Sequence, residues 1–129
     1  MFLNRGDRLA IVDFEDRKIN YTELVNNVKY FSENVIPAEK EDFGLILMEN
    51  RPEWIYTYFA LWDRKAIPIA LDSTSSSKEI LYVLGDSDPK FIICSNESEK
   101  NVREAVSMYE KVEITVINVD NHPIDENKL

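Results

Sequence analysis

Apolar residues follow two different periods along the chain. Short apolar runs, unbroken or alternating, predict strands at Leu9–Phe14, Lys18–Asn20, Phe43–Met48, Ala66–Leu71, Phe91–Cys94 and Ile114–Val119. Between most of these runs the apolar residues recur every three or four positions, which predicts helices. Strands alternating with helices predict a three-layer α/β fold, in which a largely parallel sheet is flanked by helices and preceded by a short N-terminal hairpin.

The first helix is predicted to begin after Asn20. Asn20 can cap it, and Glu23 stands at the spacing of a capping box. Pro37 ends the pattern. The apolar stripe of this helix, which we expect to face the sheet, consists of Leu24, Val28, Phe31 and Val35.

The segment from Leu45 to Asp72 predicts one right-handed βαβ unit. Asn50 and Glu53 have the spacing of a capping box, and Pro52 lies in the first helical turn, where its missing N–H costs nothing. These residues are therefore expected to matter for folding and packing.

The helix of this unit is rich in aromatic residues. Its main apolar stripe consists of Trp54, Tyr58, Leu61 and Trp62. Tyr56 and Phe59 fall off that stripe, so more than one helix face is apolar. We therefore expect the helix to be covered on two sides.

Two later helices show the same signals. Ser76 with Glu79 and Asn96 with Glu99 have capping-box spacing. The stripes behind them consist of Ile80, Leu81 and Leu84, and of Val102, Ala105, Val106 and Tyr109. Residues 1–129 are expected to form a single domain, with 120–129 as a polar, frayed tail.

Composition excludes some classes of function. The net charge of −9 argues against nucleic acid or an anionic membrane as a partner. The longest apolar runs are far shorter than the ~20 residues that span a bilayer. The N-terminus shows neither the basic segment nor the apolar run of a signal peptide. We therefore expect a cytoplasmic protein without a transmembrane segment.

The sequence offers little for binding phosphate. Its three glycines, Gly6, Gly44 and Gly85, are too far apart to form either common glycine-rich phosphate motif. The serine run Ser73–Ser77 could bind an anion at a helix N-terminus, but a loop followed by a helix cap is the favoured interpretation.

Other candidate sites are also weak. Cys94 with His122 could supply a nucleophile and a base, but His122 lies in a polar tail with nothing to orient it. Four acidic residues suggest a receiver domain, although the first three lead into a hairpin and no lysine follows the last strand: Asp13, Glu15, Asp16 and Asp72. No Cys/His cluster indicates zinc. We therefore predict no catalytic, cofactor-binding or metal-binding residue in this chain.

Four segments in order resemble the N-terminal region of AMP-forming acyl-CoA synthetases, a branch of the adenylate-forming ligases: INYTELV (19–25), ENRPEW (49–54), AIPIALD (66–72) and ILYVLGDSDPKFIIC (80–94). The resemblance covers residues 8–95. The sequence departs from the family pattern at Lys65, where glycine is usual, and at Ala70 and Ser73, where proline is common. The ENRPEW segment is most similar to the long-chain fatty acid branch.

The resemblance implies the N-terminal subdomain of a larger acid–thiol ligase. Such an enzyme joins a carboxylate to AMP with ATP and Mg²⁺, releases pyrophosphate, and then transfers the acyl group to CoA. The family's phosphate loop, ribose-binding motif and catalytic lysine are absent from this sequence. We therefore expect the isolated chain to be inactive and to hold none of these cofactors.

The remainder of such a ligase is expected to pack on Trp54, Tyr56 and Phe59 of the aromatic helix. Two alternatives remain from the sequence. One is a free-standing α/β interaction module that binds a partner through the same helix. The other is the receiver-like signalling domain, which would take up phosphate at an aspartate.

Overall fold

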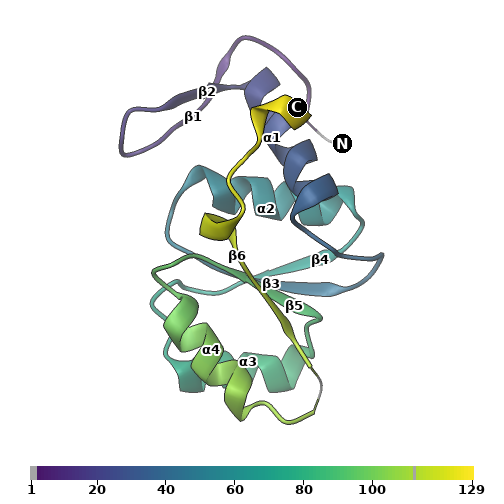
Figure 1. The fold of residues 1–129 in the computed structure, drawn as a ribbon, viewed down its shortest axis with the longest axis vertical. Coiled ribbons are helices and arrows are strands. Elements are labelled where there is room, and N and C mark those ends of the chain that lie inside the picture. The colour runs from purple at the N-terminus through teal and green to yellow at the C-terminus, as the bar shows by residue number, and fades with distance from the viewer. Residues whose placement is uncertain (1–2, 112) are drawn as a thin grey trace.

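A four-stranded parallel sheet forms the centre of the molecule, shown in Figure 1 as a computed structural model that describes residues 3–111 and 113–129. The strand order is β4-β3-β5-β6, and Leu45 of β3 lies opposite Ile69 of β4 and Ile92 of β5. The sheet strands are β3 (Phe43–Leu47), β4 (Ile67–Ala70), β5 (Phe91–Cys94) and β6 (Thr115–Asn118). A separate antiparallel hairpin consists of β1 (Leu9–Val12) and β2 (Lys18–Asn20).

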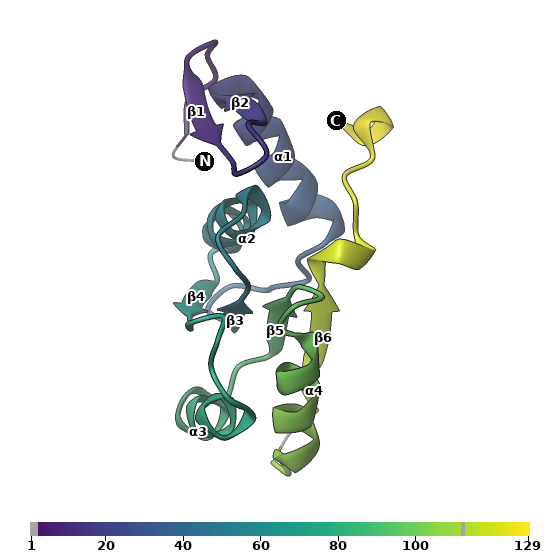
Figure 2. The same cartoon turned by 90° about the vertical axis from the view of Figure 1, so that its left-hand side faces the viewer.

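Helices cover both faces of the sheet, which confirms the three-layer prediction (Figure 2). One face carries α1 (Tyr21–Asn34) and α2 (Pro52–Asp63), and the other carries α3 (Ser77–Ser87) and α4 (Glu99–Met108). Two short 3₁₀ turns, η1 (Val119–Asn121) and η2 (Glu126–Lys128), follow β6.

The direction of the crossovers determines where loops gather. From β3 the chain passes through α2 to β4 on one side, whereas from β5 it passes through α4 to β6 on the other. The loops after β3 and β5 therefore leave toward opposite faces. In open α/β sheets, such a divergence of neighbouring carboxyl ends is the usual place for a ligand.

Two of the four predicted capping boxes are confirmed. At α1, the Glu23 N–H donates to Asn20 Oδ1 at 2.8 Å, and the Asn20 N–H donates to Glu23 Oε1 at 3.3 Å. At α3, Ser76 and Glu79 make the same reciprocal pair at 3.2 and 3.1 Å.

The other two boxes are wrong. The residue that precedes α2 is Arg51, which makes no side-chain cap, so Asn50 lies one position too early; Pro52 does occupy the first turn as predicted. The helix α4 begins after Ser98, and the Asn96 side chain accepts a hydrogen bond from Asn118 instead. In both cases the helix begins later than predicted, so the loop between the strand and the helix is longer.

The predicted stripe of α1 is buried but packs chiefly on α2, so α2 lies nearer the sheet (Figure 2). The close approach of α2 to β3 depends on Gly44. A Cβ atom there would lie 2.6 Å from the buried Phe91 ring and 3.0 Å from Leu61. Glycine at this position therefore sets the distance between the helix and the sheet.

The segment after β6 runs along the α1 side of the molecule (Figures 1 and 2). The Tyr30 hydroxyl donates to the Pro123 carbonyl at 3.3 Å, and Ile124 packs against the core beneath α1. Fraying of residues 120–129 stays a prediction. Within the described residues, none of the helices combines the length and apolarity that a bilayer crossing requires.

Candidate functional site

The loops that follow β3, β5 and β6 meet at the carboxyl ends of the sheet strands, where a ligand is expected in this class of fold. Polar side chains from all three loops interact there. We call this group the carboxyl-end network, and its members are Glu49, Arg51, Glu53, Ser95, Asn96, Asn118 and Asp120.

Arg51 is the centre of the carboxyl-end network. Its guanidinium lies 2.8 Å from Asp120, 3.2 Å from Glu49 and 3.1 Å from Glu53. Burial alone would lower the pKa of Arg51, but the hydrogen bonds to Asp120 and Glu53 raise it above its ordinary value. The hydrogen bond from Arg51 in turn lowers the pKa of Asp120. This cation is therefore fully engaged by carboxylates of the same chain.

The remaining members connect β5 and β6 to this centre. The Ser95 hydroxyl donates to Glu49 at 2.7 Å, and the Asn96 N–H donates to Asp120 at 2.8 Å. Burial alone would raise the pKa of Glu49, but the hydrogen bond from Ser95 and the contacts with Arg51 outweigh it and lower the pKa.

The buried polar atoms of the network are all paired. Every buried side-chain nitrogen or oxygen among the described residues has a hydrogen-bond partner. The arrangement therefore fastens three loops together.

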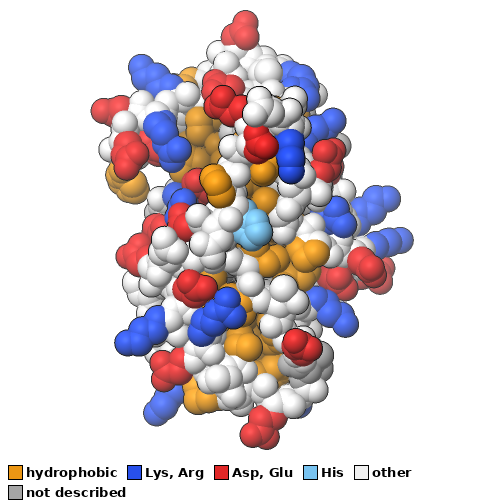
Figure 3. All heavy atoms as spheres, viewed as in Figure 1, with side chains coloured by type: hydrophobic (Ala, Val, Ile, Leu, Met, Phe, Trp, Pro, Cys, Tyr) orange, Lys and Arg blue, Asp and Glu red, His pale blue; other side chains and the backbone are white. Residues whose placement is uncertain are grey.

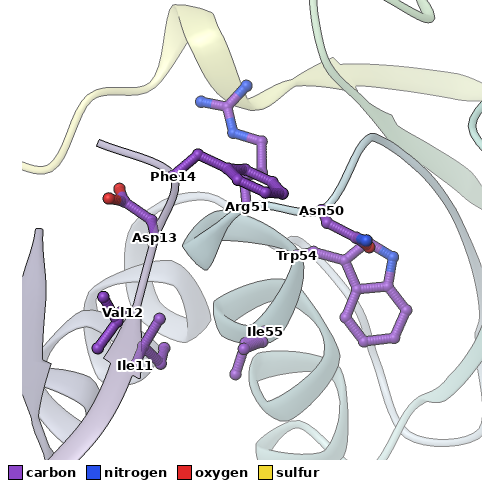
Figure 4. A pocket seen from close by; sticks show the side chains of 8 residues that line it. All are labelled: Ile11, Val12, Asp13, Phe14, Asn50, Arg51, Trp54 and Ile55. Carbon is purple, nitrogen blue, oxygen red and sulfur yellow. The ribbon is translucent and has the colours of Figure 1, made fainter. Parts of the chain in front are cut away.

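A pocket of about 350 Å³ lies beside the network, between the hairpin and the start of α2 (Figure 4). Its lining residues are Ile11, Val12, Asp13, Phe14, Asn50, Arg51, Trp54 and Ile55. A second hollow of about 580 Å³ shares Phe14, Asn50 and Trp54 and continues to Asp72 and Ser73. In Figure 4 the Arg51 guanidinium extends toward the segment after β6, where it binds Asp120. The pocket is therefore bounded mainly by apolar side chains.

The serine run forms a loop and a helix cap, as the favoured interpretation predicted. Asp72 accepts hydrogen bonds from the Thr74 N–H at 2.9 Å and from its hydroxyl at 2.7 Å, while Ser76 caps α3. An anion at this helix start would lie near the Asp72 carboxylate, which would repel it.

The structure does not form a cysteine nucleophile. Cys94 is fully buried, and burial raises the pKa of its thiol to about 12. The thiolate is the reactive form, so this side chain is a buried apolar group at neutral pH. His122 is exposed in the segment after β6, and its side chain makes no hydrogen bond in the described structure.

The acidic residues that suggested a receiver are not assembled into a site. Asp13 accepts hydrogen bonds from the backbone of Glu15 and Arg17 and pairs with the Arg17 side chain, whereas Asp72 binds Thr74. No group of three or more His, Cys, Asp or Glu side chains within residues 3–111 and 113–129 could hold a metal ion.

The outward face of α2 carries four aromatic side chains, Trp54, Tyr58, Phe59 and Trp62, which we call the aromatic surface. Trp54 and Tyr58 stack with ring centroids 5.4 Å apart, and Tyr58 lies 4.9 Å from Trp62. Phe59 meets Trp62 edge to face at 5.9 Å. Trp62 is 40% exposed, and the other three rings are half-buried.

Tyr56 does not belong to the aromatic surface, so the prediction that it contacts the rest of a larger protein is wrong. It is 3% exposed, packs edge to face on Phe31 at 5.5 Å, and accepts a hydrogen bond from Asn27 at 3.0 Å. The inward face of α2 consists of Tyr56, Thr57, Ala60 and Leu61. Only Leu61 of the predicted main stripe is fully buried. The helix carries two apolar stripes, and periodicity alone cannot tell which of them faces the core.

Sequence reasoning missed the residues of the carboxyl-end network as a group. It singled out Glu53 as part of a cap, but not its contact with Arg51 or the role of Asp120. The available signal was positional, because polar residues follow three predicted parallel strands and carboxyl ends of parallel strands share one edge of a sheet.

Comparisons with known proteins agree on one family. The family model described as "AMP-binding enzyme" matches residues 3–129. The 2-succinylbenzoate–CoA ligase of Bacillus velezensis is 29% identical over 107 residues, covering 77% of this chain and 22% of the relative.

Two solved structures show the same fold. The O-succinylbenzoate coenzyme A synthetase of Bacillus subtilis, in complex with ATP and magnesium ion, has a TM-score of 0.79 at 25% identity, covering 95% of this chain and 32% of that one. A long-chain-fatty-acid–CoA ligase of Archaeoglobus fulgidus has a TM-score of 0.80 at 18% identity, covering 92% and 25%. This chain thus spans a third or less of each of these three proteins.

Proposed function

The chain belongs to the AMP-binding enzyme family, and from this premise we propose that it is the N-terminal subdomain of an ATP-dependent, AMP-forming acyl-CoA synthetase. The parent enzyme would convert a carboxylate, ATP and CoA into acyl-CoA, AMP and pyrophosphate through an acyl-adenylate. Mg²⁺ and ATP would be held by other parts of the parent. This chain would serve as a scaffold and supply no catalytic residue.

The observation that carries the scaffold role is the closure of the carboxyl-end network. Phosphoryl transfer requires cations or dipoles aimed at the developing charge. Here the central cation, Arg51, already binds three carboxylates, and the described residues contain no candidate metal site. A chain of this kind supports an active site by its shape and packing.

The aromatic surface supports a packing partner in the same polypeptide. Trp54 and Phe59 are half-buried on a helix whose opposite face is already covered by the core. Apolar surface of this kind is commonly buried in a contact with another domain. We propose that the remainder of the parent ligase covers it.

We further propose a fatty acid as the substrate, which the ENRPEW segment supports, and the cytoplasm as the compartment. The relatives include enzymes named for 2-succinylbenzoate, so the substrate assay must compare both kinds of carboxylate.

The deciding experiment reads the messenger RNA past the codon for Leu129 and then assays the complete product. We expect the frame to continue into a glycine-rich phosphate loop. The complete protein should catalyse pyrophosphate exchange into ATP that depends on a carboxylate, tested with 2-succinylbenzoate and fatty acids of several lengths. The 129-residue chain alone should show none, and exchange by it would overturn the scaffold role.

The two alternatives have their own outcomes. A stop codon directly after Leu129 would contradict the ligase proposal and favour an interaction module. Stable phosphorylation of an aspartate by a small phosphodonor would favour the receiver. Substrate preference is read from the same exchange assay, and a strict preference for 2-succinylbenzoate would overturn the fatty acid proposal alone.

A further inference from the structure

The helix α3 turns one side to solvent, at the end of the molecule opposite the hairpin (Figure 2). This side lies across the sheet from the aromatic surface of α2, so the two surfaces are separate. Its residues follow the spacing i, i+1, i+4, i+7 and i+8, which places them on one side of a helix. We call them the α3 face, and all of them are exposed: Lys78, Glu79, Tyr82, Gly85 and Asp86.

Tyr82 lies at the middle of the α3 face and is 77% exposed. Two hollows border its ring. One, of about 420 Å³, includes Lys78 and Glu79 in its lining, and the other, of about 370 Å³, includes Gly85 and Asp86. Tyrosine is enriched among the residues that dominate the binding energy of protein interfaces. The surface therefore presents both a projecting ring and a space that can receive one.

Gly85 lies inside α3 without a reason in its own chain. A Cβ atom at this position would meet nothing within 4 Å. Glycine is also one of the least favourable residues in a helix interior. The distance between two packed helices depends on the side chains at their contact, so a glycine on an exposed face permits the close approach of a second helix.

The two ends of the α3 face carry charges of the wrong sign for an isolated helix. Lys78 lies in the first turn of α3, where the helix dipole disfavours a cation, and Asp86 lies in the last turn, where it disfavours an anion. Among the residues that the structure describes, neither side chain forms an ion pair. Opposite charges from another molecule would therefore stabilise both ends.

The α3 face is also symmetric about Tyr82. Lys78 and Asp86 each lie four residues from it, and Glu79 and Gly85 each lie three. A two-fold contact between identical surfaces requires this kind of self-complementarity. We propose that two copies of this chain pair through their α3 faces, with the two helices antiparallel and crossing at Tyr82. Lys78 of each copy then lies opposite Asp86 of the other.

The direction of the tyrosine side chain completes the fit. Long side chains of a helix lean toward its N-terminus, so the Tyr82 ring covers the turn that contains Lys78 and Glu79. In the antiparallel pair this turn faces Gly85 of the second copy, and each ring enters the hollow beside that glycine. A contact of one helix per copy is small, so the dimer should be reversible. The inference does not rest on the proposed function.

Charge reversal tests the pairing. Sedimentation equilibrium of the 129-residue chain over a range of concentrations should show monomers and dimers in exchange. Lys78→Asp or Asp86→Lys alone places like charges opposite each other and should weaken association by about tenfold or more. The double variant restores opposite charges and should recover the dimer. Both changes suit the dipole of α3, so each variant should keep its fold, which circular dichroism checks.

Two further variants sharpen the test. Gly85→Gln should raise the Tm of the monomer, because glutamine is the better helix former, and should weaken the dimer, because its side chain fills the hollow. Such opposite effects exclude a loss of folding as the cause. The control reverses the same charges at the same spacing on α1, with Lys29→Asp and Glu33→Lys at exposed positions across the sheet. These changes should leave association unaltered.

Three outcomes would overturn the proposal. One is a chain that stays monomeric at every concentration. Another is a dimer that survives both single charge reversals, which would place the contact on a different surface. The third is a complete parent ligase that stays monomeric while the 129-residue chain pairs, which would assign the α3 face to its own downstream polypeptide. Pyrophosphate exchange measures the proposed function separately, so that function is unaffected by each of these results.

Discussion

The carboxyl-end network and the aromatic surface begin within one helical turn of each other, at Arg51 and Trp54, yet they differ in what they leave for a partner. In the network, Arg51 binds three carboxylates of its own chain. On the aromatic surface, Trp62 is 40% exposed and the rings contact one another along an outward helix face. The charged groups of the network are paired within the chain, whereas the aromatic surface remains partly exposed to solvent.

The difference shows that polar side chains can lie at the usual ligand position of the fold and still be paired with one another. The carboxyl ends of parallel strands are the expected place for a ligand. In this chain the charged side chains near these ends bind one another and hold three loops together. The apolar helix face, which has no chemistry of its own, is the surface that the proposed packing partner would cover.

The largest expected effect contrasts two tyrosines of α2. Tyr56→Ala removes a ring that is 3% exposed and should lower the free energy of unfolding by about 3 kcal/mol. Tyr58→Ala removes a ring of the aromatic surface and should cost about 1 kcal/mol in the isolated chain. Urea unfolding of the two variants measures both values. Equal losses would show that the aromatic surface is already part of the core.

The next effect concerns the centre of the carboxyl-end network. Arg51→Ala leaves Glu49, Glu53 and Asp120 without their cation and should lower the free energy of unfolding by about 2 kcal/mol. The control is Arg103→Ala, which breaks an exposed pair with Glu99 and should change stability by less than about 0.5 kcal/mol. A loss of similar size in both variants would mean that the network behaves as ordinary surface charge.

Acid should weaken the network and spare the aromatic surface. The folded pKa values of Glu49 and Asp120 lie below their ordinary values of 4.5 and 3.8. Their contribution is therefore full above the unfolded pKa and is lost as the pH falls through the folded pKa. Stability should be level from about pH 6 to 8 and decline below about pH 5. Urea midpoints across this range measure it, and Arg51→Ala should make the decline shallower.

The smallest effect lies at the end of α2, beyond the aromatic surface. Lys65 has a φ of 60°, in the left-handed region where a side chain is strained. Lys65→Gly should therefore raise the free energy of unfolding by about 0.5 kcal/mol, after the added freedom of glycine in the unfolded chain is subtracted. Lys65→Ala keeps the Cβ atom and should give no gain. Thermal melts of the two variants measure the difference, and a gain in both would point to the lysine charge instead.

Local signals in the sequence predicted most of the fold. The strand at 91–94 was predicted with its observed ends, and the Asn20 and Ser76 caps formed because each is a short-range pattern completed within one turn. The order of the strands was out of reach, since it depends on contacts between distant segments. The substitution of lysine for glycine at position 65 marked a true backbone feature, because the chain keeps the left-handed turn.

The candidate site was less predictable than the fold. The contact between Arg51 and Asp120 joins residues 69 positions apart, and no short pattern encodes it. On α2, Tyr56 and Tyr58 are both aromatic residues at helical spacing, and the sequence could not tell which faces the core. That choice is made by Phe31 and Asn27 of α1, which pack against Tyr56.

The exposure of the aromatic surface has a consequence during protein synthesis. A chain as long as the 2-succinylbenzoate–CoA ligases would need roughly 20 to 70 s to complete its remaining length at about 5–20 residues per second. During that interval the finished N-terminal segment would stand on the ribosome with the aromatic surface partly exposed, Trp62 by 40%. On the proposed function, this surface would be covered only once the downstream polypeptide has been made and has folded against it.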